Sequence, residues 1–172
     1  RLTHLERLPA RPGRTTEWPE WASPEIIEAY AARGVARPWT HQVEAAEAAY
    51  AGRNVVVATG TASGKSLAYQ LPVLTALVED PHATALYLSP TKALCADQLR
   101  AVTDVTTAEP ELGRVHACAY DGDTSTELRQ WARSHSRWIF TNPDMLHMSM
   151  LPGHARWSRF FRRLRYVVVD EC

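Results

Sequence analysis

The chain has 172 residues, of which 45% are hydrophobic and 22% are charged, and its formal net charge at pH 7 is zero. This length is enough for one domain with a buried core, and the composition is ordinary for a soluble globular protein. Neutral charge does not by itself indicate a nucleic-acid binder, so any such function has to be argued from motifs. No apolar run approaches the roughly 20 residues of a membrane span, and residues 1–20 lack the apolar core of a secretory signal.

The three cysteines, Cys95, Cys118 and Cys172, are scattered and form no CxxC pair. This pattern is typical of a reducing compartment and argues against a disulfide framework or a zinc site. We therefore expect a cytoplasmic protein without a membrane partner, and no metal ligand among the cysteines and the scattered histidines. Cys95 and Cys118 are expected in the core, and Cys172 is expected to pack beside the site described below.

A proline-rich segment with two tryptophans, Trp18 and Trp21, occupies residues 1–23. Its prolines predict an extended N-terminal arm, which the tryptophan side chains would pack onto the rest of the protein. A regular pattern then begins, because residues 23–25 supply a serine N-cap, a first-turn proline and a first-turn acid. We therefore expect an extended arm followed by one domain over residues 24–172.

Within that domain, helical patterns alternate with short apolar segments that are typical of buried strands. The expected strands are 54–58, 83–88, 114–119, 137–140 and 166–170. The expected helices are 24–33, 40–51, 65–78, 91–104, 124–134, 142–148 and 154–164. In the last of these helices, one face carries a core-facing stripe of Trp157, Phe160, Phe161 and Leu164. The alternation predicts an α/β fold with a doubly wound, mostly parallel sheet, whose ligands bind at the carboxyl ends of the strands.

A loop of small residues, 59–64, lies between the first expected strand and the helix that follows it. Small residues let backbone N–H groups close around phosphate oxygens, a lysine can reach the β- and γ-phosphates, and a hydroxyl can bind Mg²⁺. The strict GxxxxGK[ST] pattern is not met, because Thr59 stands where its first glycine would be, but the Gly-Lys-Ser core is intact. The residues expected to hold the phosphates of ATP are Thr61, Ala62, Ser63, Gly64, Lys65 and Ser66.

Two adjacent carboxylates, Asp170 and Glu171, follow the last expected strand. In phosphoryl transfer, one carboxylate holds the Mg²⁺ shell and the next orients or deprotonates the attacking water. Because this strand would belong to the same sheet as the phosphate loop, we expect Ser66 and Asp170 to bind Mg²⁺. The residues expected to be catalytic are Lys65, Asp170 and Glu171.

Together with the phosphate loop, five further segments resemble the motifs of the superfamily 2 DEAD/DEAH-like helicases across nearly the whole chain. They are the glutamine motif at 39–42, motif Ia at 89–94, motif Ib at 120–124, a nucleic-acid motif at 141–147 and motif II at 169–172. In this resemblance Gln42 reads the adenine edge of ATP, since one side-chain amide offers both a donor and an acceptor.

The segments Thr-Gly-Thr-Ala-Ser-Gly-Lys-Ser, Pro-Thr-Lys-Ala-Leu and Asp-Gly-Asp-Thr resemble more narrowly the bacterial and fungal DNA-repair helicases typified by MrfA. This family includes an actinobacterial branch with Asp-Glu-Cys in motif II, and in it the alanine at position 62 is normal. The resemblance implies the first of two RecA-like domains, ATP-driven 3′-to-5′ movement on DNA and a separate C-terminal domain. It also implies ATP and Mg²⁺ as cofactors. The implied partners are single-stranded or forked DNA and the second RecA-like domain of the same polypeptide.

Nucleic-acid contacts are expected where helices start, because backbone N–H groups and hydroxyls there bind phosphates without reading bases. Thr91 and Thr141 are each predicted to lie at such a helix start, and Gly122 would let the backbone approach closely. The residues to which the resemblance gives a nucleic-acid role are Pro90, Thr91, Lys92, Gly122, Thr141 and Asn142.

Superfamily 2 enzymes carry the arginine finger and half of the nucleic-acid track on the second RecA-like domain, whereas this chain stops at motif II. We therefore expect this polypeptide alone to bind Mg-ATP weakly, to hydrolyse it very slowly and to unwind nothing, because a missing arginine finger costs roughly 10³–10⁵ in turnover. RNA stays open as the substrate, because the expected contacts are to the backbone. A P-loop kinase or transporter-type ATPase would lack the upstream glutamine and the Pro-Thr-Lys segment. A non-catalytic nucleic-acid-binding module would not need both the Gly-Lys-Ser core and the acidic pair intact.

Overall fold

The structure of the protein is a computed structural model that describes residues 3–6, 13–60 and 63–171. The predicted roles of Thr61, Ala62 and Cys172 fall outside these residues. The strands are β1 (Thr84–Leu88), β2 (Ala117–Ala119), β3 (Trp138–Thr141) and β4 (Leu164–Val169). The α-helices are α1 (Pro24–Ala32), α2 (Thr40–Tyr50), α3 (Lys65–Glu79), α4 (Lys92–Thr106), α5 (Thr126–His135), α6 (Pro143–Met145) and α7 (Ser158–Phe161). Short 3₁₀-helices span Pro110–Arg114 and His154–Trp157, and a π-helical turn spans Leu146–Met150.

A parallel sheet with the strand order β2-β3-β1-β4 runs through the described part of the chain. β1 lies between β3 and β4, so that Leu86 has Ile139 as its neighbour on one side and Val167 on the other. At least one helix separates each strand from the next along the chain, as parallel pairing requires. The predicted α/β fold with a parallel sheet is confirmed.

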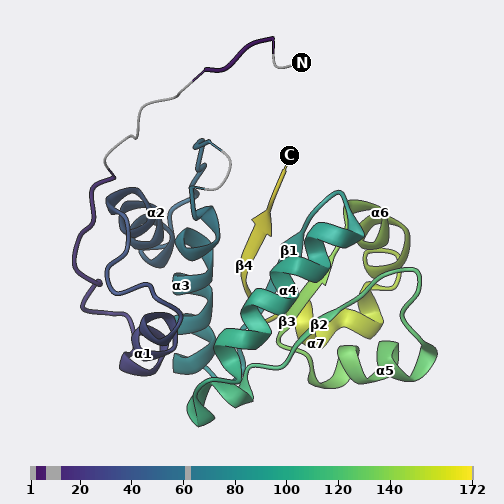
Figure 1. Ribbon diagram of the computed structural model, residues 1–172. Coiled ribbons are helices and arrows are strands. Elements are labelled where there is room, and N and C mark those ends of the chain that lie inside the picture. The colour runs from purple at the N-terminus through teal and green to yellow at the C-terminus, as the bar shows by residue number, and fades with distance from the viewer. Residues whose placement is uncertain (1–2, 7–12, 61–62, 172) are drawn as a thin grey trace.

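Helices cover both faces of the sheet, and alternate residues of β1 point to different helices. Ala85 and Tyr87 belong to a core that includes residues of α1, α3 and α4. Leu86 and Leu88 belong to a second core, which includes residues of α5 and α7. Figure 1 shows α1, α2 and α3 grouped on one side of the molecule and α5, α6 and α7 on the other. The end of β4 and the starts of α3 and α4 lie at the same end of the domain (Figure 1).

Both tryptophans of the N-terminal segment pack against the helical layer. The ring of Trp18 lies 6.0 Å from the ring of Tyr30 in α1, measured between centroids. Trp21 stacks on Tyr50 at the end of α2, with centroids 4.1 Å apart. These contacts are the tryptophan packing that the sequence predicts.

The strand predicted at 54–58 is wrong. This segment has no regular secondary structure, and Val56 is 93% exposed. A cavity of about 340 Å³ separates the segment from β4, and Val55, Val57 and Val167 are among its lining residues. Apolar strand residues are buried only where neighbouring elements cover them, and no strand of the described residues fills this gap.

β4 has the predicted position but not the predicted burial. Tyr166 and Val168 pack on the core that contains α3. Val167 and Val169, on the opposite face, are 53% and 52% exposed. The prediction of a buried strand is therefore correct for one face of β4 and wrong for the other. Among the described residues β4 pairs only with β1, so it stands at the end of the sheet with one edge open.

β2 is shorter than the predicted strand at 114–119. It is limited to Ala117–Ala119, because the preceding residues form a 3₁₀-helix that ends at Arg114. That turn buries Leu112 completely in the core. This core contact holds the chain in a helical turn up to Arg114, where the sequence pattern predicts the start of a strand.

The single helix predicted at 154–164 is also wrong. It breaks into a 3₁₀-helix and α7, and Leu164 already belongs to β4. Trp157 and Phe160 are buried, as predicted for the apolar stripe. The break lets the chain turn into the sheet, where Leu164 pairs with Thr84 of β1.

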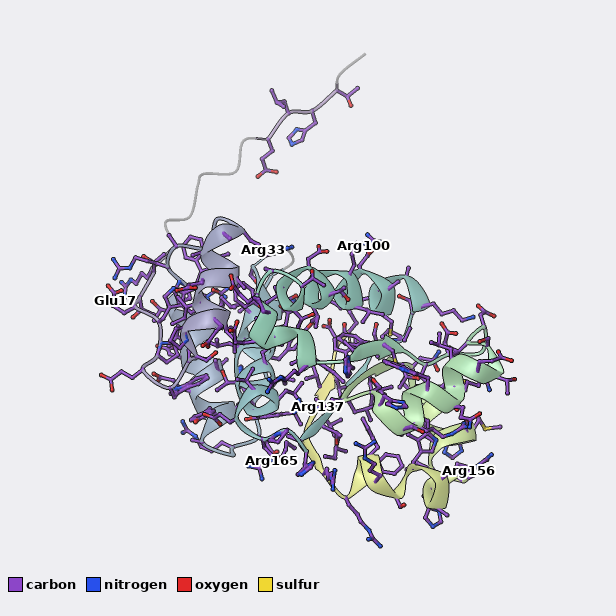
Figure 2. All side chains as sticks on the ribbon, turned by 90° about the horizontal axis from the view of Figure 1, so that it is seen from below. Glu17, Arg33, Arg100, Arg137, Arg156 and Arg165 are labelled. Carbon is purple, nitrogen blue, oxygen red and sulfur yellow. The ribbon has the colours of Figure 1, made fainter. Side chains whose placement is uncertain are left out.

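Arg137 joins the end of α3 to the start of β3. Its guanidinium donates to the backbone carbonyl oxygens of Leu77, Asp80 and Ala83. Burial lowers the pKa of this guanidinium below its ordinary value, although the group stays charged at neutral pH. Figure 2 shows Arg137 near the middle of the molecule, whereas Arg100 points outwards.

The two described cysteines behave as core residues. Cys95 and Cys118 are buried and unpaired, as predicted, and burial raises the pKa of both thiols, which keeps them protonated. Within the described ranges, no group of three or more histidine, cysteine, aspartate and glutamate side chains could hold a metal ion. A search of the same residues finds no helix with the length and apolar character needed to cross a bilayer.

Candidate functional site

Gly64 forms the junction between the phosphate loop and α3. It has a φ of 71°, in the left-handed region that glycine adopts without strain, and it is the N-cap of the helix. A Cβ at this position would lie only 2.5 Å from Gln42 Nε2, so a larger residue would have to displace the Gln42 amide as well as adopt a strained φ. Among the described residues no side chain caps the first turn of α3, which leaves backbone N–H groups for an anion.

Lys65 and Ser66 occupy the first turn of α3. The Lys65 ammonium donates to the carbonyl oxygen of Thr59 at 3.1 Å, and Thr59 Oγ1 lies 2.6 Å from Ser63 Oγ. The lysine therefore folds back over the loop, where a phosphate oxygen could replace the carbonyl as its acceptor. Ser66 Oγ donates to Oε1 of Gln98, a residue of α4, at 3.0 Å.

Gln42 lies in the first turn of α2 and is 4% exposed. Its Oε1 accepts a hydrogen bond from the backbone N–H of Trp39, and its Nε2 donates to the carbonyl oxygen of Gly64, both at 2.8 Å. One lone pair and one N–H hydrogen are left for a further partner, so adenine recognition by Gln42 stays a prediction. His41 also contacts the phosphate loop, because its Nε2 lies 3.1 Å from the Ser63 carbonyl oxygen. The sequence did not reveal that residues of the glutamine motif hold this loop in place.

Asp170 directly follows β4, and its carboxylate accepts a hydrogen bond from the Tyr87 hydroxyl at 2.6 Å. Burial, and then the bond to Asp170, raise the pKa of Tyr87 far above its ordinary value, so the hydroxyl keeps its proton and donates. Glu171 is exposed and has a φ of 58°, which is uncommon for a residue other than glycine.

Lys65 and Asp170 line the same cavity, although they belong to α3 and to the end of β4. Most of the remaining lining comes from the residues before the phosphate loop, the flank of α3 and the open edge of β4. The cavity thus extends along the edge of the sheet, well beyond the phosphate loop. We assign only the part lined by Lys65 and Asp170 to the candidate nucleotide site, because these residues come from the phosphate-loop helix and from the acidic pair after β4.

Thr91 and Lys92 begin α4 on an exposed surface, next to the exposed Pro90. The Thr91 hydroxyl oxygen accepts from the backbone N–H of Leu94 at 3.2 Å, which is the predicted helix cap. The Lys92 ammonium forms an ion pair with Asp123. This pair raises the pKa of Lys92 and lowers that of Asp123. The start of α4 and the turn that contains Asp123 therefore form one surface.

Gly122 lies in that turn, which follows β2 and is exposed. Arg129 of α5 holds the turn by donating to the carbonyl oxygens of Asp121, Gly122 and Thr124. The same guanidinium lies 5.6 Å from the centroid of the Tyr120 ring. The sequence did not indicate this support, because an arginine in the middle of a polar helical pattern is usually interpreted as a solvated residue.

The position predicted for Thr141 is wrong. Thr141 is the last residue of β3, it is 1% exposed, and its hydroxyl donates to the Tyr120 carbonyl oxygen at 2.5 Å. The helix start is Asn142, whose Oδ1 accepts from the backbone N–H of Met145 at 2.8 Å. The exposed nucleic-acid candidates are thus Pro90, Thr91, Lys92 and Gly122, with Asn142 partly exposed.

Residues 39–172, more than half of the chain, match the family described as DEAD/DEAH box helicase. The chain belongs to the DEAD/DEAH box helicase family. The ATP-dependent helicase HRQ1 of Saccharomyces cerevisiae is 47% identical over 133 residues, which cover 77% of this chain and 12% of that protein. The uncharacterized ATP-dependent helicase YprA of Bacillus subtilis is 41% identical over 171 residues, which cover 99% of this chain and 22% of that protein.

Solved helicase structures share the fold of this DEAD/DEAH-family chain. The crystal structure of DUF1998 helicase MrfA bound to DNA and AMPPNP matches it with a TM-score of 0.88 and 41% identity, over 94% of this chain and 22% of that one. The structure of Mycobacterium smegmatis helicase Lhr bound to ssDNA and AMP-PNP gives a TM-score of 0.76 and 27% identity, over 88% and 20%. The RecA-like fold and the resemblance to MrfA-type helicases are therefore confirmed. The chain spans less than a quarter of the length of each of these four proteins.

Proposed function

We propose that residues 24–172 are the first RecA-like, ATP-binding domain of an ATP-dependent DNA helicase, and that residues 1–23 precede it as an N-terminal arm, of which Trp18 and Trp21 pack on α1 and α2. In the full-length protein, ATP hydrolysis would drive 3′-to-5′ movement along DNA and unwinding. The observation that carries this proposal is that Lys65, at the start of α3, and Asp170, directly after β4, line the same cavity. The MrfA structure bound to DNA and AMPPNP supports both ligand classes.

The phosphate loop fits a nucleoside triphosphate. The uncapped first turn of α3 offers backbone N–H groups to phosphate oxygens. Lys65 would exchange the Thr59 carbonyl for a β- or γ-phosphate oxygen, which is a stronger acceptor because it is charged. Gln42 would keep its bond to the Gly64 carbonyl and use its remaining donor and acceptor on the adenine edge.

Ser66 and Asp170 fit a Mg²⁺ ion, because a hydroxyl and a carboxylate are hard oxygen ligands. Such sites use one or two protein oxygens together with phosphate oxygens and water. A bound Mg²⁺ ion would neutralise charge that develops on the phosphates. The Tyr87 hydroxyl would hold the Asp170 carboxylate in one orientation for this role. Glu171, just beyond it, would orient or deprotonate the attacking water.

The DNA backbone would lie across the exposed starts of α4 and α6 and the turn after β2. Thr91 and Asn142 supply helix caps there, Lys92 supplies positive charge, and Pro90 and Gly122 supply exposed backbone. Contacts of this kind position a strand without reading its sequence. DNA rather than RNA is proposed because the chain is 41% identical to MrfA, whose structure holds DNA.

The test is steady-state ATP hydrolysis by the longest natural form of this protein, with single-stranded DNA, with single-stranded RNA and without nucleic acid. Lys65→Ala serves as the control, because it removes the phosphate contact and leaves the DNA surface intact. We expect strong stimulation by DNA that the variant lacks. Stimulation by RNA alone would keep the ATP site and overturn the DNA assignment. No stimulation by either nucleic acid would overturn the motor function.

A further inference from the structure

Gln98 lies in the second turn of α4 and reaches across to the first turn of α3. Its Oε1 accepts one hydrogen bond from Ser66 Oγ at 3.0 Å and another from the Tyr69 hydroxyl at 2.5 Å. Ser66 and Tyr69 are three residues apart, so they share one face of α3. A single oxygen atom of α4 therefore accepts hydrogen bonds from two hydroxyl groups on α3.

The direction of the bond from Ser66 matters for the metal-binding role proposed above. A serine hydroxyl has one proton to donate and two lone pairs. When the oxygen gives a lone pair to a cation, its proton has to point towards an acceptor on the other side. Gln98 Oε1 is such an acceptor, so the hydroxyl is already turned with its lone pairs free. If the Gln98 amide were flipped, its N–H group would donate to Ser66 Oγ and occupy one of the serine lone pairs.

The proposed carboxylate ligand is held in a related way from a third element. Asp170 accepts from the Tyr87 hydroxyl of β1. The rings of Tyr87 and Tyr69 lie 5.7 Å apart between centroids, and Tyr69 is the second donor to Gln98. Ser66 and Asp170 are thus connected through a chain of contacts that runs over Gln98, Tyr69 and Tyr87. Each of the two metal-ligand candidates has its own support.

We propose that Gln98 is a positioning residue for the Mg²⁺-binding serine, and that it joins this serine to the helix whose start carries the candidate DNA contacts. The inference rests on the proposed function, since it deepens the role given there to Ser66. Gln98 lies in the same helix as Lys92 and seven residues after the cap Thr91, which is about 10 Å along a helix axis at 1.5 Å per residue. A helix is rigid over that distance, so a shift of its start on a DNA backbone moves Oε1 relative to the Ser66 hydroxyl.

The test compares three substitutions in the longest natural form of the protein. Gln98→Met keeps the length and removes the amide acceptor, Gln98→Asn keeps the amide and withdraws it by one methylene, and Gln98→Glu keeps an acceptor in place. Mg²⁺ is titrated against AMPPNP binding by calorimetry, and separately against ATP hydrolysis with and without single-stranded DNA. Thermal melting and AMPPNP binding in EDTA report whether each variant is folded.

We expect Gln98→Met and Gln98→Asn to raise the half-saturating Mg²⁺ concentration about tenfold, the lower end of what residues that orient metal ligands contribute. AMPPNP binding in EDTA should be unchanged, and the stimulation of hydrolysis by DNA should fall. Gln98→Glu should stay close to wild type in all of these measurements. Gln98→Met and Gln98→Asn both take the acceptor away from Ser66 by different means, so the test still holds if one of the two variants folds poorly.

Three results would overturn the proposal. A lower melting temperature with an unchanged Mg²⁺ titration would mean that Gln98 only fixes α4 on α3. Equal losses in Gln98→Met and Gln98→Glu would mean that the acceptor is not what matters. DNA stimulation that is unchanged in Gln98→Met would remove the link to α4. Failure of the proposed function looks different, because the wild-type protein itself would then show no Mg²⁺-dependent AMPPNP binding or no DNA-stimulated hydrolysis.

Discussion

Replacing Gly64 by alanine tests two reasons for the glycine at the start of α3, namely its positive φ and the lack of space for a Cβ beside Gln42. The φ of 71° at this position costs an L-residue roughly 1–2 kcal/mol. The new Cβ would also lie 2.5 Å from Gln42 Nε2, so the amide would have to move. Its bonds to the Gly64 carbonyl and the Trp39 N–H would then be lost, at about 1 kcal/mol each. We therefore expect Gly64→Ala to lower the free energy of unfolding by about 3–4 kcal/mol.

Gly52→Ala is the matched control for this measurement. Gly52 has a φ of 78°, and no atom lies within 4 Å of the place that its Cβ would take, so its replacement should cost only the roughly 1–2 kcal/mol of backbone strain. Urea denaturation of both variants measures the difference. In a Gln42→Ala background the clash is absent, and Gly64→Ala should then cost no more than Gly52→Ala. Equal costs for the two glycines in the wild-type background, or an unchanged cost of Gly64→Ala without the glutamine, would refute the reasoning.

Two further predictions concern the acidic site and the surface at the start of α4. Tyr87→Phe removes the donor to Asp170, and we expect it to lower the rate of ATP hydrolysis about tenfold, as loss of a support for a metal ligand does. Asp123→Asn breaks the exposed pair with Lys92. It should leave stability unchanged, because exposed pairs contribute little, and it should strengthen DNA binding measured by fluorescence anisotropy, since the ammonium is released for phosphate. The pKa of Asp123 is lowered by Lys92, so any stabilisation by the pair is present above the ordinary aspartate pKa and is lost as the pH falls through the lowered one.

Each of these predictions has a result that would contradict it. Wild-type hydrolysis by Tyr87→Phe would show that Asp170 needs no support from β1. For Asp123→Asn, unchanged DNA affinity at low salt would place Lys92 outside the DNA surface. Lys92→Ala is the matched control there, because it should weaken binding while removing the same ion pair.

The sequence predicted best what depends on short local patterns. The start of α3 after Gly64, the capped start of α4 at Thr91 and the acidic pair after β4 all lie where the sequence placed them, because each is defined by neighbours along the chain. The parallel sheet follows in the same way from the alternation of apolar segments and helical patterns. Burial is different, since it depends on what lies beside a segment in space. The valines of the segment 54–58 indicate a buried strand, but Val55 and Val56 are exposed and Val57 is only partly buried, because no element of the described part of the chain covers them.

Contacts between remote elements could not be predicted from the sequence. Tyr87 reads as one more apolar residue of a strand, and only the structure shows its hydroxyl against Asp170. Gln98 reads as a polar residue on a helix, 32 positions away from the serine that donates to it. The prediction for Thr141 was wrong because the sequence pattern placed the end of the strand one residue too early. Thr141 reads as a helix cap, but the sheet extends one residue further than the pattern suggests and buries it.

The open edge of β4 bears on how this polypeptide behaves at high concentration. A strand edge without a partner is a template on which an extended segment of another molecule can add. Charges normally discourage such addition, but after Arg165 the strand carries none before Asp170. Val167 and Val169 on that strand are 53% and 52% exposed. We therefore expect this polypeptide to aggregate at high concentration more readily than its ordinary composition suggests, and to store and refold best when dilute.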